Sequence, residues 1–126
     1  MATILLVDND PYLALQRKAL LERKFRDVMR VGDAAEALCL VEQPEFAVNL
    51  ALVISGEHVQ GIGGPAFVSE LHTRMPKVPV LVLGQGNEAS DDYPGGQVLL
   101  LQKPFTTEQM LAATGELLAH HQLNPA

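Results

Sequence analysis

The sequence of 126 residues is short of several features on which particular classes of protein depend. It has one cysteine, which excludes an internal disulfide, and its longest apolar runs are far shorter than the roughly 20 residues that cross a bilayer. The 9 basic residues are outnumbered by 15 acidic ones, and a net charge of −6 argues against general nucleic-acid binding, which needs concentrated positive charge. We therefore expect neither a membrane nor a nucleic acid as a partner.

What the sequence does have suits one globular domain. Apolar residues make up 48% of the chain, enough to bury a core within a single domain over residues 1–126. The first residues lead straight into the apolar run Ile4–Val7 with no basic leader, so we expect no secretory signal and a cytoplasmic location.

Two local features call for an interpretation. Cys39 stands among Ala37, Leu38 and Leu40 in a helical pattern, which predicts a buried side chain rather than a reactive thiol. Six of the nine basic residues lie within 17–30, and we interpret them as a solvated helix face, the alternative being a local positive edge.

Continuous apolar runs alternate with helical patterns along the chain. A strand that is covered on both faces in a parallel sheet has no polar face, so such runs predict buried strands at 3–7 and 50–55. Further strands are predicted at 80–83 and 98–101, with a short second strand at 27–31. Helices are predicted after Asp10, after Asp33, after Gly64 and after Thr106 or Thr107. The order predicts an α/β fold, a doubly wound three-layer sandwich of five βα units around a five-stranded parallel sheet.

The helix between the fourth and fifth strands is the weak unit. Residues 84–96 contain four glycines, three acidic residues and a proline, with almost no apolar periodicity. We expect this helix to be short or degenerate, with at most one turn from Asn87 to Tyr93 and loop elsewhere.

Four segments carry a resemblance to a known family: Ile4–Pro11, Leu52–Ser55, Pro79–Leu83 and Leu101–Phe105. In their order and separation the chain resembles the receiver domain of bacterial response regulators, over essentially its whole length. The resemblance implies a flavodoxin-like fold whose site lies at the carboxyl ends of the strands. There, receivers take a phosphoryl group from a histidine kinase onto an aspartate, assisted by magnesium, a lysine and a serine or threonine.

This sequence departs from the family at most of these positions. The acceptor position falls on Gly56, which has no nucleophile, and the hydroxyl position falls on Gly84. The acidic pair that helps to hold magnesium reads Asp8-Asn9, which lacks one of its two charges. Lys103 matches, and we expect a cis peptide before the next residue, Pro104, as in the family. The sequence thus predicts a degenerate site with no bound metal and no cofactor.

Two nearby side chains could replace the missing acceptor. Glu57 follows directly, but alternate side chains of an extended strand point to opposite faces, so it should not reach the site. His58 has the right parity but lies in the following loop, so we interpret it as an ordinary loop histidine.

The leading functional hypothesis is a non-enzymatic pseudo-receiver that binds a histidine kinase or another regulator without phosphorylation, with Asp8 and Lys103 joined in a salt bridge. The alternative is a sensor for a small ligand or anion, because the glycine-rich loop 61–64 precedes a helix. An enzyme using Asp8, Glu57, His58 and Lys103 is a third reading, which no catalytic motif supports. The resemblance also suggests a homodimer through the last helix and the fifth strand.

Overall fold

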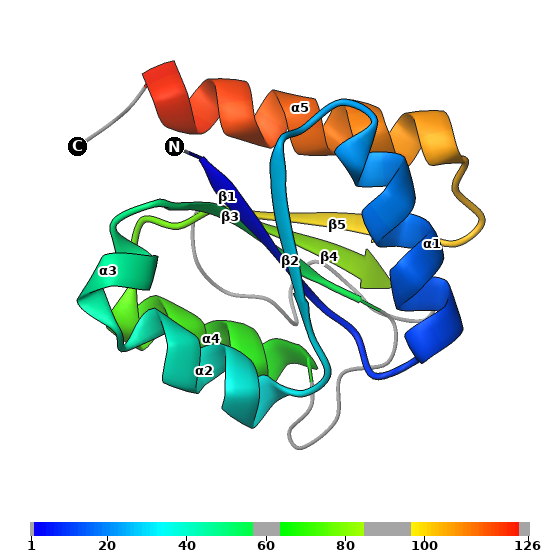
Figure 1. The fold of residues 1–126 in the computed structure, drawn as a ribbon. Helices are drawn as coiled ribbons and strands as arrows, with labels where there is room; N and C mark the ends of the chain where they lie inside the picture. The colour runs from blue at the N-terminus through cyan, green and yellow to red at the C-terminus, as the bar shows by residue number, and fades with distance from the viewer. Residues whose placement is uncertain (1, 57–63, 85–96, 124–126) are drawn as a thin grey trace.

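The computed structural model describes residues 2–56, 64–84 and 97–123, and these form a parallel sheet between two layers of helices (Figure 1). The strands are β1 (Thr3–Val7), β2 (Asp27–Val31), β3 (Leu50–Ser55), β4 (Val80–Gly84) and β5 (Val98–Gln102). The helices are α1 (Pro11–Glu22), α2 (Ala34–Val41), α3 (Pro44–Ala47), α4 (Gly64–Arg74) and α5 (Thr107–Leu123). The sheet order β2-β1-β3-β4-β5 confirms the predicted doubly wound, flavodoxin-like α/β fold.

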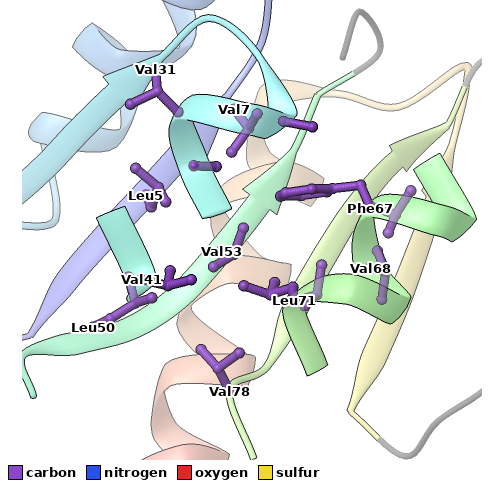
Figure 2. Packing of buried hydrophobic residues seen from close by; sticks show 14 residues of the cluster. Leu5, Val7, Val31, Val41, Leu50, Val53, Phe67, Val68, Leu71 and Val78 are labelled. Carbon is purple, nitrogen blue, oxygen red and sulfur yellow. The ribbon is translucent and has the colours of Figure 1, made fainter. Parts of the chain in front are cut away.

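The strands separate two hydrophobic cores because successive side chains point to opposite faces of the sheet. Leu5 and Val7 of β1 contact the core beneath α2 and α4, where Phe67 and Leu71 are fully buried (Figure 2). The alternate residues of β1 contact the core beneath α1 and α5. The continuous apolar runs of β1, β3 and β4 therefore reflect burial on both faces, whereas β2 and β5, the two edge strands, are only partly buried.

Side-chain caps fix where the helices begin. Asp10 accepts hydrogen bonds from the backbone N–H groups of Tyr12 (3.0 Å) and Leu13 (3.1 Å) at the start of α1. At α5, Thr106 and Gln109 form a reciprocal capping box, in which each backbone N–H donates to the other's side chain at 2.7 and 3.1 Å. The caps predicted at Asp10 and Thr106 are confirmed, and α1 thereby starts directly beside the end of β1.

Cys39 corrects one prediction, because it is exposed rather than buried. Ala37 and Val41 of α2 face the sheet, and Cys39, two positions from each, lies on the opposite side of the helix. Apolar neighbours in the sequence had suggested burial, but helical geometry separates them in space.

Two further predictions bear on the helices. No pattern in the sequence indicated α3, a single turn at Pro44–Ala47. The short or degenerate helix predicted near Asn87 to Tyr93 lies outside the described residues. Within 2–56, 64–84 and 97–123, no helix combines the length and the apolar character needed to traverse a bilayer.

Candidate functional site at the carboxyl ends of the strands

The site predicted from the sequence begins where β1 and β3 end side by side. Val7 and Ser55 are partners in the parallel register, so Asp8 and Gly56 follow on neighbouring strands. The N–H of Gly56 donates to the Val7 carbonyl at 2.8 Å, which holds the two chain segments together beyond the last strand pair. The fold therefore brings the predicted acceptor position and the predicted metal carboxylate into one corner.

Asp8 is fully buried, and its polar atoms have partners from three parts of the chain. Its Oδ1 accepts a hydrogen bond from the N–H of Asp10 (2.9 Å), and its Oδ2 accepts one from Nη1 of Arg17 (3.3 Å). Arg30 on β2 donates from Nε (3.1 Å) and Nη2 (2.8 Å) to the main-chain carbonyl of Asp8. The contacts with Asp10 and Arg17 give the buried carboxylate the compensation that a charge requires away from water, and those with Arg30 satisfy the main-chain carbonyl.

Arg17, like Arg30, is a site residue that the sequence pattern did not single out. It was interpreted as part of a solvated basic face, yet only 7% of the residue is exposed. Its guanidinium carbon lies 5.6 Å from the centre of the Phe105 ring, within the range of a cation–π contact. A signal was present in the sequence: Arg17 stands three residues after Ala14 and four before Leu21, on the buried face of α1.

Gly56 is required by the close approach of Asp8. A Cβ atom built on Gly56 would lie 2.7 Å from Cγ and 2.9 Å from Cβ of Asp8, and closer still to Oδ2. The backbone of Gly56 does not adopt the left-handed conformation that favours glycine. Glycine is therefore needed here because there is no room for a Cβ atom, and not because of its backbone torsion angles. The carboxylate of Asp8 fills the volume that a side chain at position 56 would need.

The other predicted residues lie around this corner or beyond the described chain. Gly84 ends β4 and is buried, Asn9 is exposed beside Asp8, and Lys103 is exposed directly after β5. The Lys103–Pro104 peptide is cis, as predicted, whereas the salt bridge between Asp8 and Lys103 stays a prediction.

The surrogate acceptors Glu57 and His58 lie outside the described residues. So do residues 61–63 of the glycine-rich loop on which the anion-sensor hypothesis depends.

The described side chains at the carboxyl ends of the strands do not fit the magnesium ion that the resemblance implies. Magnesium prefers an octahedral set of oxygen ligands, usually including carboxylates. Asp8 is the one buried carboxylate among the described residues, and its Oδ2 already faces the Arg17 guanidinium. Gly56 and Gly84 supply no side-chain oxygen, and nowhere in the described ranges do three His, Cys, Asp or Glu side chains gather as a metal-binding group.

Comparison with known proteins gives structural matches only. No protein-family model matches the chain, and no curated protein sequence does. Among solved structures, a response regulator receiver domain from Clostridium thermocellum is 22% identical with a TM-score of 0.83, covering 98% of each chain. The signal receiver domain of an HD domain-containing protein from Pseudomonas fluorescens Pf-5 is 25% identical with a TM-score of 0.82, covering 96% of this chain and 97% of the other.

The receiver domain of the hybrid histidine kinase CckA is also 25% identical, with a TM-score of 0.74 over 92% of this chain and 98% of that one. These likenesses extend over nearly the whole of each chain. They show that the described residues have the fold of response-regulator receiver domains.

Proposed function

We propose that this chain is an atypical receiver, a pseudo-receiver, that acts in two-component-type signalling through phosphorylation-independent protein–protein interaction. The observation that carries the proposal is the corner formed by Asp8, Arg17 and Gly56. The acceptor position has no side chain, and a buried ion pair fills the space beside it. The receiver fold supports a role in two-component signalling. The arrangement of Asp8, Arg17 and Gly56 supports a role that does not depend on phosphorylation.

The chemistry of phosphoryl transfer explains why these changes act together. Such transfer depends almost wholly on positioning the reacting groups and neutralising the charge of the transferred group. Gly56 removes the nucleophile, Asn9 removes one metal carboxylate, and Gly84 removes the hydroxyl group. Since the side chain of Asp8 also occupies the acceptor volume, an aspartate restored at position 56 alone would displace it rather than rebuild the site.

The partners expected for such a domain are signalling proteins, such as a histidine kinase or another regulator. Two large apolar side chains of α1 support a binding role, because Tyr12 is 82% and Leu15 is 68% exposed. They stand three residues apart and therefore project from the same side of the helix. We propose that this side of α1 contributes to the binding surface.

A homodimer through α5 and β5 is part of the same proposal. β5 is an edge strand, and all five of its residues are only partly buried, so it has surface left to cover. Light scattering over a dilution series should then show a mass that falls from dimer to monomer. A monomer at every concentration would remove the dimer from the proposal without affecting the rest.

The direct test is incubation with acetyl phosphate and magnesium followed by intact-mass measurement. We expect no added phosphoryl group on this chain or on its Gly56→Asp variant. A receiver that retains its acceptor aspartate, treated in parallel, controls for an active phosphodonor. A stoichiometric adduct on the unaltered chain would contradict the proposal, and peptide mapping to Glu57 or His58 would show that another residue had taken over as acceptor.

A further inference from the structure

An arginine and an aspartate are buried together at the carboxyl end of β1, which is where ligands bind in open parallel sheets. The side chain of Arg17 is 8% exposed and that of Asp8 is 0% exposed, with 3.3 Å between Nη1 and Oδ2. A buried ion pair pays a large desolvation cost and often adds little stability compared with apolar residues of the same volume. Its presence at this position therefore calls for an explanation beyond stability.

We propose that the Arg17 guanidinium is a built-in cation that occupies the place of a divalent metal ion at Asp8 and makes the site indifferent to such ions. The inference rests on the proposed function and deepens it. It states what keeps Asp8, Arg17 and Gly56 in place when neither a metal ion nor a phosphoryl group is bound. Asp8 has the oxygen chemistry that a hard cation selects. Arg17 supplies positive charge to that oxygen from within the chain, so an incoming metal ion would meet like charge.

The same guanidinium positions several segments at once. Arg17 belongs to α1, its charged group faces Asp8 at the end of β1, and it lies over Phe105 in the connection from β5 to α5. Arg30 of β2 holds the main-chain carbonyl of Asp8 through two further hydrogen bonds. The end of β1 is thus fixed relative to α1, β2 and the start of α5 by residues of the chain itself. Arg17 is a positioning residue in this account, with no catalytic role.

The inference predicts that removing the charge of Arg17 creates affinity for a metal ion. The probe is Mn²⁺ alone, with free Mn²⁺ followed by electron paramagnetic resonance. Asp8 is then the one side-chain carboxylate of a weak site that water completes, and we expect Arg17→Gln to bind one Mn²⁺ roughly tenfold more tightly than the unaltered chain. Arg17→Lys, which keeps a cation, should behave like the unaltered chain. Arg23→Gln removes an exposed charge at the end of the same helix and should change nothing at Asp8, so it controls for net charge.

A second substitution identifies the binding atom. Adding Asp8→Asn to Arg17→Gln should abolish the gained affinity, because the carboxylate is then gone. If Arg17→Gln is unfolded without metal, Mn²⁺ must restore its circular dichroism spectrum, since a ligand that binds only the folded state stabilises it. If Arg17 had a purely structural role, Arg17→Gln would only be less stable. A folded variant with no gain in Mn²⁺ affinity, or an unfolded variant that Mn²⁺ does not refold, would overturn the inference.

Failure of this inference can be distinguished from failure of the proposed function. If Arg17→Gln gains Mn²⁺ but still takes no phosphoryl group from acetyl phosphate, both proposals stand. If the unaltered chain is phosphorylated, the proposed function fails, whatever the metal titration gives. If the unaltered chain already binds Mn²⁺ at Asp8 as tightly as Arg17→Gln, the inference fails alone.

Discussion

Placing one methyl group on Gly56 should destabilise the protein far more than a surface substitution would. In Gly56→Ala the new Cβ meets Cγ and Cβ of Asp8 at 2.7 and 2.9 Å, which real contacts do not tolerate. Overpacking of this kind costs about 1–3 kcal/mol. If Asp8 turns away instead, its contact with Arg17 is lost, and breaking a buried ion pair costs about 3–5 kcal/mol. We expect the free energy of unfolding to fall by about 2–4 kcal/mol.

Urea unfolding followed by circular dichroism measures this change, and an unaltered m value would show that the native state remains compact. Gly115→Ala is the matched control, because a Cβ there meets nothing within 4 Å. It should stabilise the chain by about 0.5–1 kcal/mol through helix propensity. In an Asp8→Gly background, which removes every side-chain atom that the new Cβ meets, Gly56→Ala should cost much less. Equal costs in the two backgrounds, or a Gly56→Ala variant as stable as the unaltered chain, would refute the steric account.

Three further predictions test other parts of the structure. Leu71→Ala should lower the free energy of unfolding by about 2–5 kcal/mol because it opens a cavity in the core. Leu15→Ala, at a 68% exposed position, should change it by less than about 0.5 kcal/mol. Similar urea midpoints for the two variants would contradict the assigned burial. Thr106→Ala removes a capping-box side chain and should cost about 1 kcal/mol in thermal unfolding, so an unchanged Tm would argue against the cap. Cys39 should react with a thiol reagent in the native protein as fast as in urea, and strong native protection would restore the prediction of burial.

The fold was predictable because its strands carry a strong local signal. Four or more consecutive apolar residues in runs such as Ile4–Val7 and Leu50–Ile54 indicate strands covered on both faces, and the helical patterns between them supply that cover in a parallel sheet. Capping residues at Asp10 and Thr106 then placed the helix starts. The single turn of α3 escaped prediction because four residues are too few to show helical periodicity.

The site was only partly predictable, for a different physical reason. Gly56 and Asp8 could be placed because strand ends determine what lies together at the edge of a parallel sheet. The role of Arg17 depends on a contact between α1 and the end of β1, nine residues apart, which no local pattern reveals. Its place on the buried face of α1 was the available clue, and the surrounding basic residues obscured it. Cys39 shows the converse, since apolar neighbours in sequence led to a wrong prediction of burial.

The most direct test of the central claim is an amide nuclear magnetic resonance spectrum recorded before and after adding magnesium and beryllofluoride, a mimic of the phosphoryl group. The account predicts that the resonances of Asp8, Gly56 and Lys103 do not move, because Gly56 has no side chain to accept a phosphoryl group and the Asp8 carboxylate is paired with Arg17. Saturable shifts of these resonances, spreading from the strand ends into α1 and α5, would show a working phosphorylation site and would contradict the account.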